Sequence, residues 1–305
     1  MKETVAYVNG EWKPRSEVSI DLGDRGFYLG DAVFDLFRTF DGTPFRIEDH
    51  VDRFFRSLKF VRMDPGITPD EMVALGQECV ARNEPLRSDF GDWSVWFGVT
   101  RGLAGWRTLD AEPTFLIHAA QVPFDSFAEQ YADGASAVIT RSRNHGHQSL
   151  EPKLKHTSRM HLNLSDLEAR DVDPAAWPIL LDAEGNIAEG SGSNLFVVKD
   201  GAMKTPSDTT ILRGVTRDVV FELAEGLGIP LSEEPIQPYD LYTADEVFFT
   251  STPFCVLPIT RIDRRDIADG RPGPVATRLL TAFSELAGID VVDQALRYKD
   301  ARSNI

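Results

Sequence analysis

Cysteine is scarce in this sequence. Only two cysteines occur among 305 residues, so the chain cannot rely on a framework of several disulfides. Cys79 falls in a segment with a helical pattern, and Cys255 follows an apolar strand pattern. Thiols in such places are expected to be buried and reduced. The sequence therefore predicts a protein of a reducing compartment, the cytoplasm.

Long apolar runs are also absent, since no stretch approaches the roughly 20 apolar residues that a membrane-spanning helix needs. Residues 1–10 have the pattern of a strand and a turn, which is not that of a secretory leader. Basic residues are few, with 32 Lys and Arg against 48 Asp and Glu and a net charge of −16. This charge would repel a nucleic-acid backbone or an anionic membrane. We therefore expect neither a nucleic acid nor a membrane as partner.

The sequence does contain a mixture of strand and helix patterns. Asn9-Gly10 separates two short strand patterns and predicts a hairpin, and Asp41-Gly42 predicts a second one after the strand 32–40. Thr68-Pro69-Asp70-Glu71 is a capping box that opens a helix. Strands are expected at 5–8, 11–12, 32–40, 44–47, 92–100, 113–120, 135–141, 177–181, 194–198 and 246–250. Helices are expected near 48–61, 69–83 and 159–170. Residues 212–218 lead into another helix, which ends near Gly226 or Gly228, and the last helix is expected near 274–287.

The length of the chain suffices for two domains with separate cores. Residues 121–134 carry Pro123 and lack a clean apolar period, so we interpret them as an interdomain linker. The predicted fold class is α/β (α+β), with a small N-terminal α/β domain at 1–120 and a larger C-terminal domain at 135–305.

Two residues in the second half are suited to one cofactor. Lys155 precedes a helix pattern, and Glu189 precedes a glycine-rich turn. An amine can form a Schiff base with the aldehyde of pyridoxal phosphate, and a carboxylate can keep the pyridine nitrogen protonated so that the ring accepts electrons. Taken alone, the pair has an ordinary interpretation as two solvated surface residues. The other motifs of the chain decide between these interpretations.

Seven motifs resemble, in order along the chain, those of the class IV aminotransferases, which are pyridoxal phosphate enzymes of fold type IV. This family includes branched-chain aminotransferases, D-amino-acid aminotransferases, (R)-amine transaminases and aminodeoxychorismate lyases. The motifs are Tyr28-Leu-Gly-Asp-Ala-Val-Phe34, His50-Val-Asp-Arg53-Phe, Thr100-Arg-Gly102, Lys155, Glu189-Gly-Ser-Gly-Ser-Asn194-Leu-Phe, Gly214-Val-Thr216-Arg217 and Val247-Phe-Phe-Thr-Ser-Thr252. Together they span nearly the whole chain.

The resemblance implies roles for these residues. Lys155, rather than Lys153, is the Schiff-base lysine and the base that moves a proton at the α carbon of the substrate. Glu189 is the partner of the pyridine nitrogen. Backbone N–H groups where a helix begins, at 214–216, suit the phosphate. The implied cofactor-binding residues are Arg53, Lys155, Glu189, Ser193, Asn194, Gly214, Val215, Thr216, Ser251 and Thr252.

The resemblance also implies an architecture and a reaction. The larger domain is expected to contain a barrel-like sheet, with the site in the cleft between the two domains. A homodimer is expected, in which the loop 103–109 contributes to the partner's pocket. The reaction is a ping-pong transfer of an amino group between an amino acid or amine and a 2-oxo acid. The enzymatic alternative is a lyase resembling the aminodeoxychorismate lyases, which use the same lysine and cofactor.

The substrate pocket departs from the patterns of the relatives. Met160 stands where many relatives have a tyrosine, Arg107 lacks the histidine that follows in D-amino-acid enzymes, and Leu36 replaces the glycine of branched-chain enzymes. The candidate substrate-binding residues are Phe34, Leu36, Arg38, Arg107, Arg159 and Met160. The three arginines are candidates for holding a carboxylate, and each could equally form a surface salt bridge. D-amino acids, L-branched-chain amino acids and (R)-amines all stay open as donors.

Two further interpretations compete with the enzyme. His145, His147, His156 and His161 could form a metal site, but no cysteine joins them and the nearby acids lack ligand spacing, so no metal is predicted. A binding module that has lost its activity is disfavoured because both Lys155 and Glu189 are present.

Overall fold

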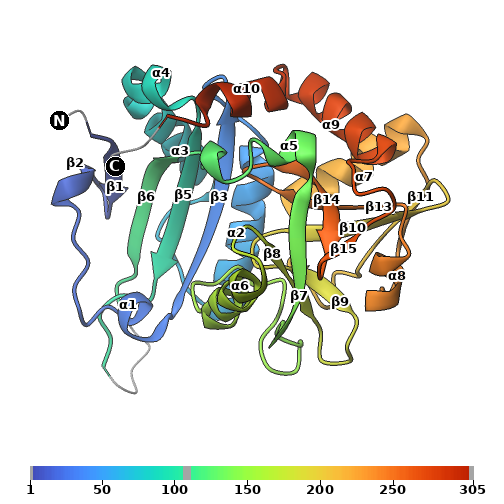
Figure 1. The fold of residues 1–305 in the computed structure, drawn as a ribbon. Coiled ribbons are helices and arrows are strands. Elements are labelled where there is room, and N and C mark those ends of the chain that lie inside the picture. The colour runs from blue at the N-terminus through green and yellow to red at the C-terminus, as the bar shows by residue number, and fades with distance from the viewer. Residues whose placement is uncertain (1–2, 106–110, 302–305) are drawn as a thin grey trace. The chain divides into compact units, whose positions relative to one another are not determined.

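The computed structural model describes residues 3–105 and 111–301, which form two compact units (Figure 1). Of the described residues, the first unit contains 3–105, 111–122, 154–158 and 300–301, and the second contains 123–153 and 159–299. This division differs from the predicted limits of 1–120, 121–134 and 135–305, because it joins the Lys155 segment to the first unit and most of the expected linker to the second.

The first unit contains a six-stranded antiparallel sheet with the order β2-β1-β6-β5-β3-β4. Its strands are β1 (Val5–Val8), β2 (Glu11–Pro14), β3 (Ala32–Phe40), β4 (Thr43–Pro44), β5 (Trp93–Thr100) and β6 (Thr114–Gln121). Both predicted hairpins are confirmed, and Asn9 and Gly10 have the positive φ angles of 46° and 96° that an Asn-Gly turn requires. The second strand of the Asp41-Gly42 hairpin, Thr43–Pro44, is shorter than the predicted 44–47, because Ile47 already begins a helix.

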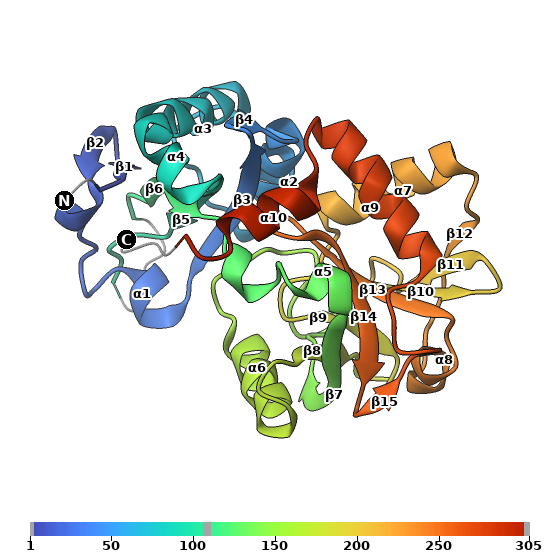
Figure 2. The ribbon, with the colours of Figure 1, turned by 45° about the horizontal axis from the view of Figure 1, so that its top comes forward.

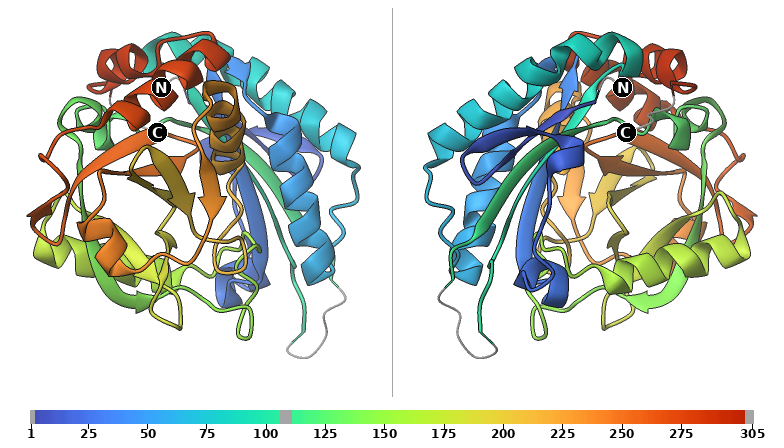
Figure 3. Two further views of the ribbon diagram at one scale, coloured as in Figure 1. Left: turned by 90° about the vertical axis from the view of Figure 1, so that its right-hand side faces the viewer. Right: turned by 90° about the vertical axis from the view of Figure 1, so that its left-hand side faces the viewer.

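Helices α2 (Ile47–Val61) and α3 (Pro69–Asn83) pack on one face of this sheet, as Figure 3 shows in blue and cyan. Val51, Phe54 and Leu58 form the buried stripe of α2, as their spacing predicts. The predicted capping box at Thr68 and Glu71 is present. The remaining short helices of this unit are η1 (Arg15–Glu17), α1 (Arg25–Leu29), η2 (Glu84–Leu86) and α4 (Arg87–Phe90).

The second unit is built on a nine-stranded mixed sheet (Figure 2) with the order β12-β11-β10-β13-β14-β7-β8-β9, in which β15 pairs with β14. Its strands are β7 (Ala135–Arg143), β8 (Trp177–Leu181), β9 (Ile187–Gly190), β10 (Asn194–Lys199), β11 (Ala202–Thr205), β12 (Leu231–Glu233), β13 (Glu246–Ser251), β14 (Cys255–Ile262) and β15 (Arg265–Asp266). The N–H of Gly190 donates to the carbonyl of Ser193 at 2.8 Å, so the last strand of the path returns to the start of β10. The sheet therefore curls into the barrel-like form that was expected.

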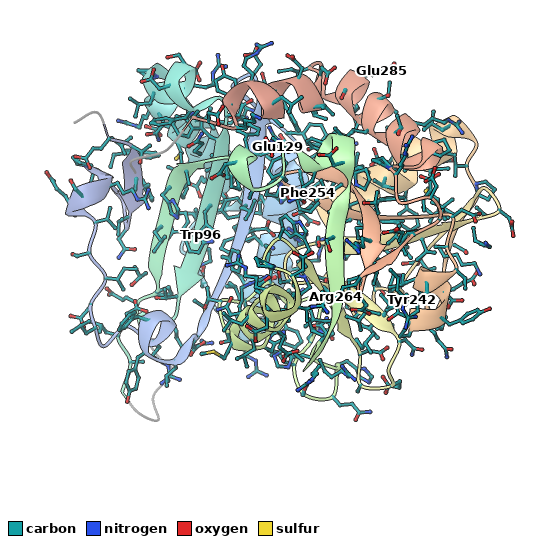
Figure 4. All side chains as sticks on the ribbon, viewed as in Figure 1. Trp96, Glu129, Tyr242, Phe254, Arg264 and Glu285 are labelled. Carbon is teal, nitrogen blue, oxygen red and sulfur yellow. The ribbon has the colours of Figure 1, made fainter. Side chains whose placement is uncertain are left out.

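Helices surround this sheet. They are η3 (Phe124–Ser126), α5 (Gln130–Asp133), α6 (Met160–Val172), α7 (Val215–Leu227), α8 (Pro238–Tyr242), α9 (Pro274–Ala287) and α10 (Val291–Tyr298). Because α10 follows α9, the prediction that 274–287 is the last helix is wrong. The expected linker is folded, since Phe124 and Phe127 are 1% exposed and the hydroxyl of Tyr131 donates to the carbonyl of Phe254, labelled in Figure 4.

The structure bears on the predictions about the two thiols and about membrane-spanning helices. Cys79 and Cys255 are buried free thiols, as expected. Within residues 3–105 and 111–301, every helix is too short or too polar to cross a membrane.

Candidate active site

Lys155 is held against the edge of strand β3. The N–H of Phe34 donates to the carbonyl of Lys155 at 3.0 Å, and the N–H of Thr157 donates to the carbonyl of Ala32 at 3.1 Å. The other edge of β3 pairs with β5, so the backbone of the lysine extends the first unit's sheet. The Nζ atom of Lys155 lies 4.9 Å from the centroid of the Phe34 ring.

The neighbouring Lys153 has a different environment. Its side chain is 45% exposed and lies 3.4 Å from a carboxylate oxygen of Glu151. Lys155, by contrast, is partly buried. An amine that must react as a neutral group is favoured by partial desolvation and a defined position. The geometry of the two lysines therefore suits Lys155 better for a covalent bond to a cofactor.

An aromatic row crosses the sheet face that carries Phe34. The Phe34 ring stacks on Trp96, labelled in Figure 4, with centroids 5.7 Å apart, and Trp96 stacks on His118 at 5.4 Å. A Cβ atom at Gly98 would lie 2.2 Å from the Trp96 ring, so only glycine allows the indole to lie there. Burial lowers the pKa of His118, and the charge of Arg15 acts in the same direction. This face therefore presents apolar rings beside the Lys155 amine.

On the opposite face of β3, a buried cluster joins the strand to α2. Arg53 donates through Nε and Nη2 to the carboxylate of Asp35 at 2.7 and 2.8 Å, and Nδ1 of His50 lies 2.9 Å from the same carboxylate. Burial alone would raise the pKa of Asp35, but the charge of Arg53 and the hydrogen bond from His50 hold it well below its usual range. Arg53 is thus a buried, charged and oriented side chain, and not the solvated arginine of an exposed helix face.

In the second unit, Glu189 is a fixed and buried carboxylate. It lies on β9 and is 8% exposed. Oε1 accepts from Nδ2 of Asn144 at 2.8 Å, and Oε2 accepts from the N–H of Leu212 at 3.1 Å and from Nδ2 of Asn194 at 3.4 Å. Hydrogen bonds to a carboxylate favour its charged form. The group is therefore arranged as an anionic acceptor.

The turn after Glu189 meets the beginning of α7. Asn194 also donates to the carbonyl of Leu212 at 2.8 Å, and a Cβ atom at Gly214 would lie 2.1 Å from the Asn194 side-chain oxygen. Glycine therefore lets the loop pass this side chain without displacing it. Within the described chain, no side chain caps the N-terminus of α7, so its N–H groups can receive an anion.

The other predicted residues of this region lie nearby. Ser193 and Thr216 are buried, and Val215 is the first residue of α7. Ser251 ends β13, which pairs with β10, and its hydroxyl donates to the carbonyl of Gly192 at 2.8 Å. Thr252 follows it. The second unit thus gathers most of the predicted cofactor-binding residues around the start of β10.

The candidate arginines are placed differently from one another. Arg38 is 1% exposed, its Nε donates to the carbonyl of Thr39, and its guanidinium covers the Phe40 ring. Arg159 donates to the carbonyl of Ser191. Burial lowers the pKa of Arg159, whereas the charges of Glu189 and Asp166 act in the opposite direction.

Three substrate candidates remain: Leu36, Met160 and Arg107. Leu36 on β3 pairs with Trp96 on β5. Met160, which begins α6, is 72% exposed. Arg107 lies outside the described residues.

These residues fit pyridoxal phosphate on chemical grounds. Lys155 offers an amine beside an aromatic ring, and Arg53 offers a buried cation. Glu189 offers an oriented carboxylate for a protonated ring nitrogen, and the N-terminus of α7 offers N–H donors for a phosphate.

Four residues of these surroundings were not predicted from the sequence: Asp35, Trp96, His118 and Asn144. Asp35 alone carried a usable signal, because alternation places it with Val33 and Phe37 on the helix-covered face of β3. A charged residue on a covered face requires a buried partner.

Comparisons with known proteins agree with this chemistry. The family model described as Amino-transferase class IV matches residues 32–262. A Methanocaldococcus jannaschii protein provisionally named branched-chain-amino-acid aminotransferase is 34% identical, with 94% of this chain and 99% of that protein covered. The D-alanine aminotransferase of Bacillus licheniformis is 30% identical, with 90% and 94% covered.

Solved structures have the same fold. A crystal structure of a branched-chain amino acid aminotransferase from Escherichia coli superposes with a TM-score of 0.86, at 27% identity and with 93% of this chain and 95% of that chain covered. Another branched-chain amino acid aminotransferase, crystallised with pyridoxamine 5'-phosphate, has a TM-score of 0.84 at 29% identity, with 98% of each chain covered. A family model that matches most of the chain, relatives that match almost end to end and a shared fold lead to one conclusion. The chain belongs to the class IV aminotransferase family and is an aminotransferase that uses pyridoxal phosphate.

Proposed function

We propose that this aminotransferase moves an amino group from an amino acid or amine with an apolar side chain to a 2-oxo acid, with Lys155 as the cofactor-bound lysine. One observation carries the assignment of Lys155. Its backbone is paired with β3, and its Nζ lies 4.9 Å from the Phe34 ring centroid, whereas Lys153 is solvent-exposed beside Glu151.

The remaining polar residues then have defined roles. When bound, pyridoxal phosphate withdraws electrons from the α carbon of the donor. Glu189 holds a proton on the ring nitrogen, and Lys155 removes and returns the proton at the α carbon. Arg53, Ser193, Asn194, Ser251, Thr252 and the N–H groups at Gly214, Val215 and Thr216 hold the cofactor in place. This set of roles is supported by the buried positions of most of these residues and by the uncapped start of α7.

The apolar donor is supported by the row of rings beside Lys155. Phe34 and Leu36 lie on the same face of β3, because alternate residues of a strand share a face. Trp96 on β5 lies on this face of the sheet too, since it pairs directly with Leu36. For a carboxylate group, we propose Arg159 and Arg107 ahead of Arg38, because the Arg38 guanidinium lies over Phe40 and its Nε bonds a backbone carbonyl. Met160 stays a proposed pocket residue.

We also propose a homodimer that acts in the cytoplasm. Exposed apolar side chains support the dimer. Phe27 and Tyr28 on α1 are 69% and 64% exposed, and Met160, Leu164 and Leu167 form an exposed stripe on α6. Apolar patches of this kind on soluble chains commonly mark an interface. The two buried free cysteines suit a reducing compartment.

The test of this function compares Lys155→Ala with Lys153→Ala. The first variant should lose turnover and the visible absorbance of the bound cofactor, and the second should keep both. Separate mixing of the wild-type enzyme with L-leucine, D-alanine and (R)-1-phenylethylamine then identifies the donor that bleaches this absorbance. A fully active Lys155→Ala variant would remove the assignment of the lysine, and a wild-type protein that stays colourless with added cofactor would remove the proposed function.

A further inference from the structure

Asp35 is an unusual residue for its position. It stands in the middle of β3, on the face covered by α2, and is 0% exposed. Burying an ionised carboxylate is unfavourable unless it is paired and hydrogen-bonded. Here Arg53 approaches side-on through Nε and Nη2, at 2.7 and 2.8 Å, and His50 adds a third contact at 2.9 Å. The strand and the helix are thus joined by a satisfied charge pair.

The local sequence explains how the three side chains meet. His50 and Arg53 are three residues apart on α2, so both point to the same side of the helix. Burial lowers the pKa of His50, while the hydrogen bond to Asp35 raises it and the charges of Arg53 and Lys155 lower it further. A neutral His50 donates its Nδ1 proton to Asp35. The carboxylate therefore neutralises Arg53, and His50 fixes the orientation of the carboxylate.

The cluster is connected to the lysine segment through one side chain. Ser57, one turn after Arg53 on α2, donates its hydroxyl to the carbonyl of Arg53 at 3.2 Å. The N–H of Lys155 donates to the same hydroxyl at 3.5 Å. All these residues belong to the first unit. Arg53 and Lys155 are thus anchored to the same strand and helix.

We propose that Asp35, supported by His50, is a positioning residue that presents Arg53 to the phosphate of the cofactor. This inference rests on the role proposed above for Arg53. A side-on pair holds the Nε–Nη2 edge of the guanidinium and so fixes the plane in which the group can meet an anion. An arginine ordered before the ligand arrives loses less conformational freedom on binding. The alternative is a pair that only fastens α2 to the sheet.

The experiment separates these two roles by comparing pyridoxal phosphate with pyridoxal, which lacks the phosphate. Pyridoxal phosphate and pyridoxal form the same bond with a lysine, but only the first carries a phosphate. Cofactor-free wild-type, Asp35→Asn, Asp35→Glu and Arg53→Met proteins are titrated with each compound, and the visible absorbance gives both affinities. We expect Asp35→Asn to weaken pyridoxal phosphate at least tenfold and pyridoxal less than twofold, with partial recovery in Asp35→Glu.

Asp92→Asn is the matched control. Asp92 is also a 0% exposed carboxylate of the first unit, and it accepts from Thr39, Asp41 and Gly42. Its loss should lower stability without changing the ratio of the two affinities. His50→Gln is a milder variant of the cluster, in which we expect a two- to fivefold change of this ratio if the proposal is correct.

The outcomes are distinguishable. An unchanged ratio in folded Asp35→Asn and His50→Gln proteins overturns the positioning role, as does a ratio that changes equally in Asp92→Asn. An unchanged ratio in Arg53→Met shows that no phosphate ligand is there to be positioned, which also overturns it. A wild-type protein that binds neither compound removes the proposed function itself.

Discussion

Replacement of Glu189 by glutamine tests the centre of the proposed site. The substitution keeps the shape of the side chain and removes its charge. In the enzyme, the carboxylate is proposed to accept a charge-assisted hydrogen bond from the protonated ring nitrogen. Such a bond contributes about 1.5–3 kcal/mol. Because about 1.4 kcal/mol corresponds to a tenfold change, the affinity for pyridoxal phosphate should fall about 10- to 150-fold.

The hydrogen bonds around Glu189 also determine how the substitution changes the stability of the cofactor-free protein. Asn144 also donates to the carbonyl of Thr210 at 2.9 Å, and Asn194 also donates to the carbonyl of Leu212. Both amides are thus held with their nitrogens toward Glu189. A glutamine amide would meet an N–H donor in either orientation, and an unsatisfied buried donor costs about 1–3 kcal/mol. The cofactor-free variant should therefore fold, with a melting temperature lowered by about 2–10 °C.

The assay compares the two proteins with two cofactors. One is pyridoxal phosphate, and the other is its analogue in which carbon replaces the ring nitrogen. We expect Glu189→Gln to lose affinity and turnover with pyridoxal phosphate, and we expect both proteins to bind the analogue with equal affinity. Glu184→Gln, at an exposed glutamate in the preceding turn, is the matched control. Equal affinity of wild-type and Glu189→Gln proteins for pyridoxal phosphate, within twofold, would refute the pairing with the ring nitrogen.

Three further predictions follow from other contacts. Glu246 accepts from the N–H groups of Val275 and Ala276 at 2.8 and 2.9 Å. Glu246→Gln should therefore lower the free energy of unfolding, measured in urea, by about 1–2 kcal/mol and leave turnover unchanged. Equal stability of the variant and the wild type would contradict this. Burial lowers the pKa of His50, so its contribution to stability is present above pH 6.5 and is lost as the pH falls below it. Between pH 7 and 5, the free energy of unfolding of His50→Gln should therefore decline less than that of the wild type, with the two slopes differing by at most about 1.4 kcal/mol per pH unit. Equal slopes of the two proteins in urea titrations would count against this prediction. Leu164→Glu should convert the proposed dimer to a monomer in sedimentation experiments, whereas a variant with the wild-type mass would exclude α6 from the interface.

Local signals predicted the regular elements of the first unit well. Strand β3 begins and ends at the predicted residues because a turn with two positive φ angles, at Asp41 and Gly42, follows it. Helix α3 also has its predicted limits, since Thr68 and Glu71 satisfy its first N–H groups. These features depend on neighbouring residues only, and the sequence displays them directly.

Elements that depend on distant partners were missed. Strand β14 contains Pro258, a residue that removes a ladder hydrogen bond and is typical of strand edges. The strand nevertheless pairs with β13 on one side and β7 on the other. Helix α10 was also missed, although its signal is local. Gly288 ends α9, and the side chain of Asp290 then accepts from two N–H groups and caps the new helix.

The same distinction applies to the candidate site. Lys155 and Glu189 were predicted because motifs of a known family surround them, and spacing alone gave no reason to prefer Lys155 over Lys153. What separates the two lysines is the pairing with Phe34, which only the folded chain brings about. Asp35 carries a signal in the sequence that belongs to no family motif. A carboxylate on a covered strand face needs a cation, and the next helix offers Arg53 on its inward side. Charges that the fold must bury in pairs are therefore a physical guide to functional residues, one that depends on the alternation of side chains and not on resemblance.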